Sequence, residues 1–111
     1  MHFNSFSIQP DEQFYVYGSI LKNQQSQESI VLSTSSVTIT DKDGTDVTSS
    51  LKVSNTDTIT DDPDGDYTDN AYAVCVMGGT EAASPYKITF SLHTNKGNIY
   101  EIDITMAVRE T

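Results

Sequence analysis

Acidic side chains are the groups whose types and spacing in this sequence come nearest to a chemical site. Four aspartates recur at short intervals within one turn-forming segment: Asp62, Asp64, Asp66 and Asp69. Carboxylate oxygens spaced in this way on a tight loop suit a hard cation such as calcium. Counted from Asp62, however, the position of a calcium loop that needs glycine holds Tyr67, and the position that needs a bidentate glutamate holds Ala73. We therefore predict a solvated acidic loop and keep a calcium loop as the alternative.

A second group of carboxylates surrounds Gly44 and comprises Asp41, Asp43 and Asp46. Aspartate side chains bond to amides just downstream in the chain, and glycine readily adopts a positive φ. The segment is therefore predicted to be a hairpin turn and not a metal site.

Nucleophiles and bases are few and scattered. The sequence holds two histidines, His2 and His93, and one cysteine, Cys75, which stands in an apolar run. No nucleophile-and-base pattern, Gly-rich phosphate loop or pair of cysteine ligands accompanies them. Glu101 and Asp103 fall on one face of a predicted strand, where neighbouring carboxylates are normally solvated. The sequence predicts an unreactive core thiol, no catalytic residue, no cofactor and no enzymatic activity.

The overall charge restricts the partners. Six basic residues stand against sixteen acidic ones in 111 residues, which gives a net charge of −10. Such a surface repels phosphate groups, so nucleic acid and anionic membranes are disfavoured and a basic protein surface is favoured. A chain of this length has room for one domain with a modest core.

Targeting signals are not recognisable in the sequence. The first residues lack the charged stretch and apolar block of a signal peptide, and no apolar run approaches the roughly 20 residues of a membrane span. We expect a protein that is made soluble and stays in the compartment of its synthesis.

The elements that must position these groups are predicted to be β-strands. Apolar and polar residues alternate over 86–92 and again over 100–108, on either side of a turn at 95–98. This period of two predicts a long β-hairpin. No window repeats apolar residues at helical spacing, so helix is expected to be nearly absent. Five further strands are predicted at about 13–21, 29–33, 37–40, 51–53 and 71–77.

Seven short strands in 111 residues predict an all-β fold, an immunoglobulin-like two-sheet sandwich. Tyr86 follows Pro85 at the start of the penultimate strand, where sandwiches often place a tyrosine whose hydroxyl bonds the backbone across a corner. The sequence has no tryptophan, which disfavours an antibody-type core. A small barrel is the alternative.

The domain organisation follows from these strands. Residues 1–10 are predicted to be an extended N-terminal arm, and residues 11–111 the sandwich domain, with an acidic loop at 54–70. Phe3 and Phe6 give the arm two apolar anchors. Such an arm either docks onto a neighbouring subunit or folds back onto its own sandwich, and both alternatives stay open.

The strand predicted at 13–21 has two different faces. Phe14, Val16 and Ile20 are expected to face one way and Tyr15 and Tyr17 the other, where the two tyrosines form an exposed aromatic pair. The partner-binding residues that we predict are Phe3, Phe6, Tyr15 and Tyr17.

Several turn and strand motifs occur in a fixed order along the chain. They are Pro10 and Glu12, Ser36-Val37-Thr38-Ile39, Asp43-Gly44-Thr45-Asp46-Val47-Thr48, Gly78-Gly79-Thr80, Tyr86-Lys87-Ile88-Thr89, Thr94 with Gly97, Tyr100-Glu101, and Val108-Arg109-Glu110. In these motifs the chain resembles a family of short immunoglobulin-like virion proteins of tailed bacteriophages, of the fibre–tail adaptor or minor structural type. The resemblance covers about residues 10–110, and its motifs are common to many β-sandwiches. The acidic segment 57–70 and the first ten residues depart from it.

The resemblance implies a non-enzymatic virion structural or adaptor protein, made in the bacterial host cytoplasm. It implies docking through the arm and a sheet edge onto other virion proteins, such as a tail, neck or major capsid subunit, in a symmetric multimer. A capsid decoration (cement) protein on the head surface is one alternative. A calcium- or carbohydrate-binding β-sandwich module, favoured by the acidic loop and the exposed tyrosines, is a more distant one.

Overall fold

The computed structural model describes residues 5–10, 12–20, 28–60 and 71–109. Strands make up most of this part of the chain, and its only helical segments are one turn each. The strands are β1 (Ser5–Ile8), β2 (Gln13–Ser19), β3 (Ser36–Thr40), β4 (Thr58–Thr60), β5 (Ala71–Met77), β6 (Tyr86–His93) and β7 (Ile99–Val108). The helical segments are η1 (Leu32–Thr34) and α1 (Thr48–Leu51).

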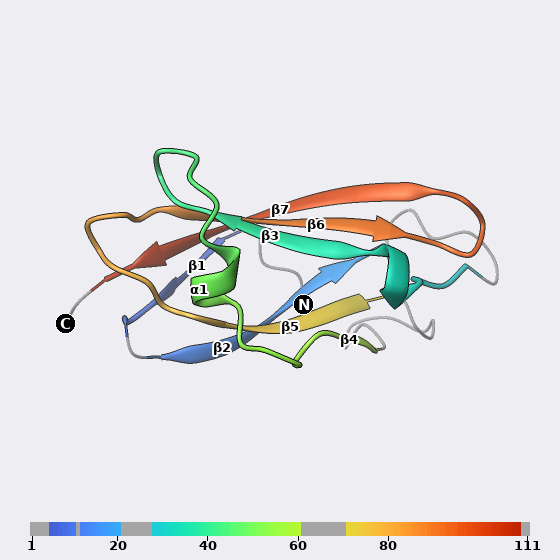
Figure 1. Ribbon diagram of the computed structural model, residues 1–111, viewed down its shortest axis with the longest axis horizontal. Helices are drawn as coiled ribbons and strands as arrows, with labels where there is room; N and C mark the ends of the chain where they lie inside the picture. Colours follow the sequence, from blue (N-terminus) through green and yellow to red (C-terminus); the bar gives the residue numbers. More distant parts are fainter. Residues whose placement is uncertain (1–4, 11, 21–27, 61–70, 110–111) are drawn as a thin grey trace.

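The strands form two sheets that face each other. One sheet has the order β1-β7-β6-β3, and the other has the order β2-β5-β4. Figure 1 shows β3, β6 and β7 on one side of the molecule and β2, β5 and β4 on the other. This arrangement confirms the predicted all-β, immunoglobulin-like two-sheet sandwich.

The C-terminal hairpin is the longest element and agrees with its prediction. β6 and β7 pair antiparallel from Tyr86 opposite Met106 to His93 opposite Ile99. Gly97, in the connecting turn, has a φ of +81°, a left-handed backbone that glycine adopts without strain. Alternate residues of β6 are buried, which is the period of two expected for a strand that lines a core.

The core lies between the two sheets. Its centre is formed by side chains without measurable exposure from β3, β5, β6 and β7: Ile39, Val74, Val76, Ile88, Phe90, Leu92 and Met106. The rings of Tyr72 and Phe90 meet edge to face across the sheets, with their centroids 5.7 Å apart. The predicted core thiol, Cys75, is buried.

Tyr86 forms the predicted corner. Its ring is buried, and its hydroxyl accepts a hydrogen bond of 2.9 Å from the Thr80 N–H. A Cβ on Gly79 would lie 2.3 Å from the Tyr86 oxygen, so the chain can pass the hydroxyl only because residue 79 has no side chain. The tyrosine thus ties the turn after β5 to the start of β6.

Two predicted strands are wrong. In the first, around 29–33, only Ile30 makes a β-bridge, to Thr94, and the chain then turns through η1. In the second, around 51–53, α1 ends at Leu51, whose side chain is buried, and only Lys52 makes a β-bridge, to Val76. An apolar residue next to polar neighbours satisfied the strand pattern in each case, although it anchors a turn.

Two strands lie where none was predicted. Residues 5–8 of the predicted arm form β1, which pairs parallel to β7, so this stretch folds back onto the sandwich, one of the two alternatives left open for the arm. Residues 58–60 of the predicted acidic loop form β4, which pairs with β5. Serines alternate with Phe6 and Ile8 in β1, but four residues before Pro10 are too few for this alternation to predict a strand.

Candidate functional site

Because β1 joins the sheet of β7, it leaves β2 at an edge of the other sheet. β1 pairs with β7 and not with β2, and the only strand partner of β2 among the described strands is β5. β2 is therefore an edge strand of seven residues. Unpaired edges of this length are the places where a sheet can accept a strand from another chain.

Two hydrogen bonds show which backbone N–H and C=O groups of β2 point toward β5 and which point away from it. The Gly78 N–H donates to the Glu12 carbonyl at 3.0 Å, which bonds the start of β2 to the end of β5. On the opposite side of β5, the Val53 N–H donates to the Cys75 carbonyl at 3.0 Å. Antiparallel partners alternate between pairs that exchange hydrogen bonds and pairs that do not. Tyr15, opposite Cys75, belongs to the second kind, so its N–H and C=O point away from β5.

The same alternation applies two residues further along β2. Tyr17 lies opposite Ala73, so its backbone groups also point outward. Within the described residues, the outward N–H and C=O groups of Tyr15 and Tyr17 have no hydrogen-bond partner. These groups form the candidate functional site, which we call the β2 edge and define as the outward side of residues 13–19.

Aromatic side chains surround the β2 edge. Tyr15 is 49% exposed and Tyr17 is 41% exposed, as predicted, whereas their neighbour Val16 is buried. Phe14 alternates onto the same face as Val16 and is 44% exposed.

Gly18 holds β2 close to the opposite sheet. A Cβ at this position would lie 2.6 Å from Cγ of Phe90, well inside contact distance. The unbroken register of β2 against β5 shows that Gly18 is not the bulge that a glycine in a strand suggests. The missing side chain makes room for the ring of Phe90.

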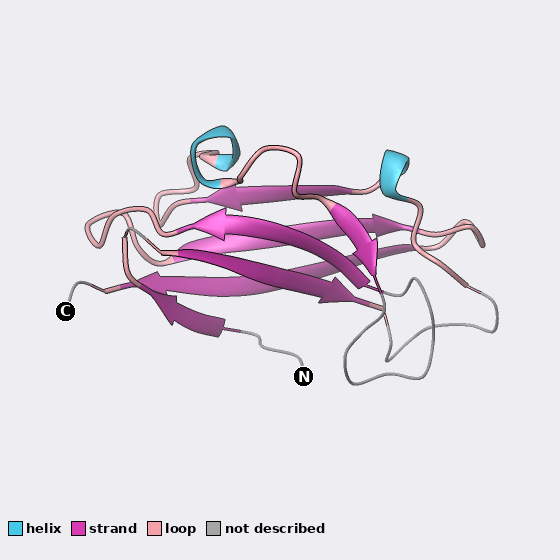
Figure 2. Ribbon diagram, turned by 90° about the horizontal axis from the view of Figure 1, so that it is seen from below, coloured by secondary structure: helices cyan, strands magenta, loops and turns pink. Residues whose placement is uncertain are grey.

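One edge of the other sheet, at β3, is protected by the chain that follows it. At β3 the Ile39 N–H donates to the Thr48 hydroxyl oxygen at 2.8 Å, and the Ile39 carbonyl accepts from the Val47 N–H at 2.8 Å. Both short helices lie along one margin of the sandwich, and β1, next to the label N, lies along the other (Figure 2). The chain covers the β3 edge and leaves the β2 edge uncovered within its described part.

The sheet that contains β2 carries no charge. None of the residues of β2, β4 and β5 is Asp, Glu, Lys or Arg. On its outer face Tyr15 and Tyr17 lie opposite the small residues Cys75 and Ala73. In a chain with a net charge of −10, this is an uncharged surface with exposed aromatic rings.

The other predicted binding residues fall in different places. Phe3 lies outside the described residues, and so do Asp62, Asp64, Asp66 and Asp69 of the predicted calcium loop. The backbone of Phe6 belongs to β1, opposite Met106. The structure therefore brings Tyr15 and Tyr17 together on β2, and it places the Phe6 backbone on a strand of the other sheet.

Two carboxylates of the turn region after β3, Asp41 and Asp46, bond to residues just downstream in the chain. Asp41 Oδ1 accepts hydrogen bonds from the N–H groups of Asp43 and Thr45, as predicted for this turn, and Gly44 has a φ of +83°. Asp46 accepts from the hydroxyl and the N–H of Thr48, and these bonds lower the pKa of its carboxyl. Within residues 5–10, 12–20, 28–60 and 71–109, no three His, Cys, Asp or Glu side chains are grouped to hold a metal ion.

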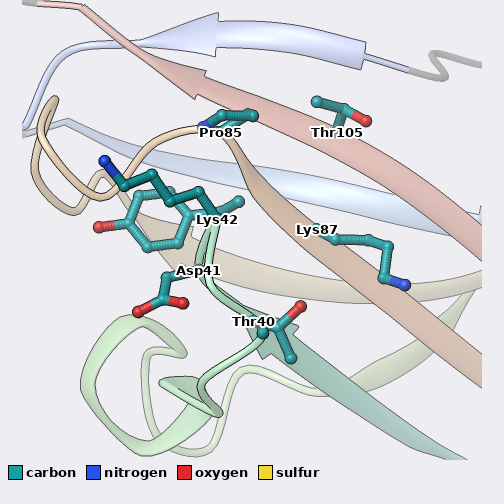
Figure 3. Close-up of a pocket in the computed structure, with 8 residues that line it drawn as sticks. Thr40, Asp41, Lys42, Pro85, Lys87 and Thr105 are labelled. Atoms are coloured by element: carbon teal, nitrogen blue, oxygen red, sulfur yellow. The ribbon is translucent and has the colours of Figure 1, made fainter.

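An open depression lies beside this turn, lined by Thr40, Asp41, Lys42, Gly44, Pro85, Tyr86, Lys87 and Thr105. Figure 3 shows that the amino groups of Lys42 and Lys87 extend in different directions, away from one another. One Asp41 oxygen is already engaged by the turn. The depression therefore has no converging set of polar groups.

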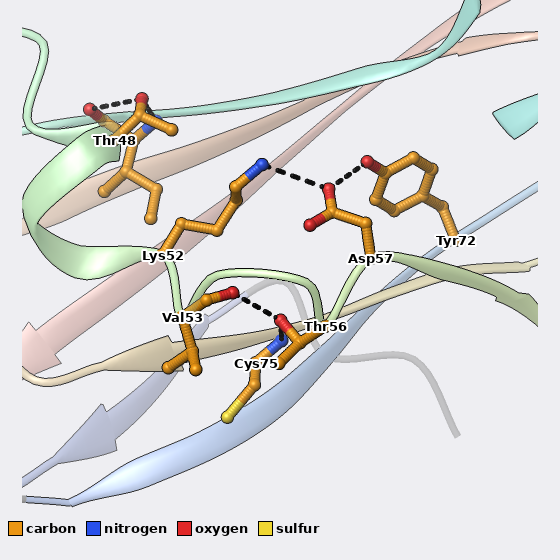
Figure 4. A network of polar contacts seen from close by, with 8 residues as sticks. Thr48, Lys52, Val53, Thr56, Asp57, Tyr72 and Cys75 are labelled. Atoms are coloured by element: carbon orange, nitrogen blue, oxygen red, sulfur yellow. Dashed lines mark hydrogen bonds and ion pairs between the residues drawn. The ribbon is translucent and has the colours of Figure 1, made fainter. Parts of the chain in front are cut away.

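A polar cluster fixes the segment before β4. Asp57 accepts from the Lys52 amino group at 3.2 Å and from the Tyr72 hydroxyl (Figure 4). Burial, followed by the hydrogen bond and the charge of Asp57, raises the pKa of the Tyr72 hydroxyl. Thr56 accepts from the Cys75 N–H and donates to the Val53 carbonyl. Asp57 is thus a structural residue of the predicted acidic loop.

A second buried cluster surrounds Glu28. The carboxylate is 2% exposed, and it accepts bonds from the Thr94 hydroxyl at 2.6 Å, the Asn98 amide at 2.8 Å and the Tyr100 hydroxyl at 3.0 Å. Burial, followed by the hydrogen bond and charge of Glu28, raises the pKa of Tyr100. This cluster ties the chain before β3 to the β6–β7 turn.

Comparisons with known proteins identify no family for this chain. No protein-family model matches the chain, and no curated protein matches it significantly. Five chains of solved structures match it. One is described as the crystal structure of the ZIG-8 IG1 homodimer, with 11% sequence identity, a TM-score of 0.42, and coverage of 97% of this chain and 82% of that one. No helix in the described part is both long and apolar enough to cross a membrane.

Proposed function

We propose that this chain is a non-catalytic structural subunit of a tailed-bacteriophage virion, an adaptor of the tail or neck. It attaches to a neighbouring protein subunit by strand addition at the β2 edge. The neighbouring strand would bond to the outward backbone groups of Tyr15 and Tyr17, and their rings would pack on its side chains.

The observation that carries this proposal is the open β2 edge. Natural sheets protect their edges with charged residues, prolines, bulges or a covering segment. β2 contains no charged residue and no proline, keeps an unbroken register with β5, and exposes two tyrosines. An edge without these protections is suited to binding a partner strand.

The resemblance to immunoglobulin-like virion proteins supports the particle as the setting. The sequence predicted docking through both the N-terminal arm and a sheet edge. Residues 5–8 of that arm already pair with β7 of the same chain, so the proposal assigns docking to the sheet edge alone.

Incorporation into particles tests the proposal. Tyr17→Lys places a charge at the centre of the β2 edge, where it hinders the addition of a strand. Ile99→Lys is the matched control, because Ile99 is 64% exposed on β7, in the other sheet. Purified particles should contain at least tenfold less of the Tyr17→Lys chain than of the Ile99→Lys chain, by quantitative mass spectrometry. Equal amounts would refute docking through β2.

Electron microscopy of particles with the chain labelled tests the location. Label at the tail or neck is the expected result. Label distributed over the head would instead identify a decoration protein.

A further inference from the structure

The sequence of β2 is self-complementary about Val16, so that two copies of the strand can pair antiparallel with matching residues opposite each other. The strand reads Gln13-Phe14-Tyr15-Val16-Tyr17-Gly18-Ser19. If a second β2 is placed antiparallel to it with the two Val16 residues opposite each other, Tyr15 of each strand faces Tyr17 of the other. In the same register Phe14 of each strand faces Gly18 of the other.

In this register the outward-pointing backbone groups of the two strands lie opposite each other. The N–H and C=O groups of both tyrosines point outward, as derived from the bonds between β2 and β5. Each Tyr15–Tyr17 pair across the two strands can therefore exchange two hydrogen bonds, as directly opposite residues of a bonded antiparallel pair do. A register shifted by one residue would oppose outward-pointing groups with inward-pointing ones.

The side chains are also complementary in this register. The exposed rings of Tyr15 and Tyr17 form cross-strand aromatic pairs on the outer face. Phe14 of each strand lies opposite Gly18 of the other, where the space toward the core is already filled by the Phe90 ring. The tyrosine pairs are therefore the side-chain contacts that favour this register.

We propose that the neighbouring subunit at the β2 edge is a second copy of this chain. The two sandwiches then share one continuous sheet of order β4-β5-β2-β2-β5-β4 about a two-fold axis through the Val16 pair. The inference rests on the proposed docking at β2 and names its partner.

The charge distribution favours a second copy over a basic protein at this edge. A basic partner gains from the acidic surface, yet β2, β4 and β5 contain no carboxylate for it to bind. Two copies of net charge −10 repel one another, and they repel least where neither surface carries charge. The uncharged sheet is thus the surface on which two copies approach at least cost.

Sedimentation of the full chain tests the proposal. Over about 1 μM to 1 mM, a range that covers weak and moderate dimers, the native chain should pass from monomer to dimer. Tyr17→Lys should weaken the dimer at least about tenfold, because it removes both cross-strand tyrosine pairs and places a charge on the edge. Ile99→Lys, which adds the same charge to β7, should dimerise like the native chain. A native chain that stays monomeric throughout overturns the inference.

Mixed variants test the register. When Tyr15→Lys is mixed with Tyr17→Glu, the introduced charges face each other, and the second pair of native tyrosines is restored. This mixed dimer should form about tenfold more tightly than either variant alone. Tyr15→Lys mixed with Tyr15→Glu brings neither benefit and is the matched control. Equal gains in the two mixtures would overturn the two-fold register.

Comparison with particle incorporation separates this inference from the proposed function. A monomeric chain whose incorporation is lost in Tyr17→Lys overturns the second copy and leaves docking at β2 standing, with a strand of another protein as the occupant. A dimer that Tyr17→Lys abolishes, without an effect on incorporation, overturns the proposed function and leaves the dimer standing.

Discussion

Gly18 shows how one residue couples the β2 edge to the core. We predict that Gly18→Ala lowers the free energy of unfolding by about 1–3 kcal/mol, because the added methyl group overlaps the ring of Phe90 and forces β2 or the ring to move. Urea denaturation measures the change. The cost should shrink when Phe90→Leu is introduced as well, and a cost independent of residue 90 would refute the assigned contact.

Glu28 shows that a buried carboxylate can serve structure alone. Three donors surround its two oxygens. We predict that Glu28→Gln costs about 1–3 kcal/mol of unfolding free energy, because the new amide directs hydrogens at groups that also donate. Glu101→Gln, an exposed change on β7, is the matched control. Unfolding curves that coincide for the two variants would contradict the buried cluster.

At the scale of elements, β1 is part of the sandwich and not a detachable arm. Deletion of residues 1–9 should therefore destabilise the domain itself. It removes the four residue pairs between β1 and β7 and the side chain of Ile8, which is 3% exposed. Loss of the Ile8 side chain alone is expected to cost about 2–5 kcal/mol.

Thermal unfolding followed by circular dichroism measures this effect. Ile8→Ala isolates the core contribution, and Ser7→Ala, an exposed change on the same strand, should be nearly neutral. A deleted chain that melts like the native chain would show that β1 contributes nothing to the fold.

Strands with strong alternation could be predicted from the sequence. The hairpin of β6 and β7, the buried β5, and the corner at Tyr86 followed from local patterns that only a core-lining strand requires. β1 and β4 have four and three residues, too few for a period to appear. Their existence depends on partners distant in sequence, β7 and β5, which supply the hydrogen bonds.

The candidate site was predictable only in part. The alternation of β2 predicted that Tyr15 and Tyr17 are exposed, and the structure agrees. The open β2 edge was not predicted, because it exists only if β1 pairs with β7 and not with β2, and no local sequence pattern indicates which strand β1 pairs with. The absence of charge from 13–19 and 71–77 was a signal that could have pointed to this sheet.

At the scale of the whole molecule, the hydroxyls of the buried Tyr72 and the half-buried Tyr100 connect stability to alkaline pH. Burial, followed by bonds to Asp57 and Glu28, raises the pKa of Tyr72 and of Tyr100 above that of a tyrosine in the unfolded chain. The stabilisation from these groups is full below the unfolded value of about 10 and is lost as pH rises through the folded values. We predict that the free energy of unfolding declines above about pH 10.

Variants at the two kinds of tyrosine identify the cause of that decline. Tyr72→Phe removes one of the two hydroxyls with a raised pKa, so the stability of this variant should fall less steeply with pH than that of the native chain. Tyr15→Phe alters an exposed hydroxyl and should retain the native slope. Identical slopes for all three proteins, measured by denaturant unfolding at several pH values, would rule out the Tyr72 hydroxyl as a cause.

Amide hydrogen exchange at β2 tests the central claim most directly, because it reads each backbone N–H of the edge. In dilute solution the Val16 N–H, which faces β5, should be protected, and the outward N–H groups of Tyr15 and Tyr17 should exchange freely. On concentration, or in the particle, Tyr15 and Tyr17 should become protected while Val16 changes little. If Tyr15 and Tyr17 exchange equally fast in the dilute and assembled states, β2 is not a docking edge.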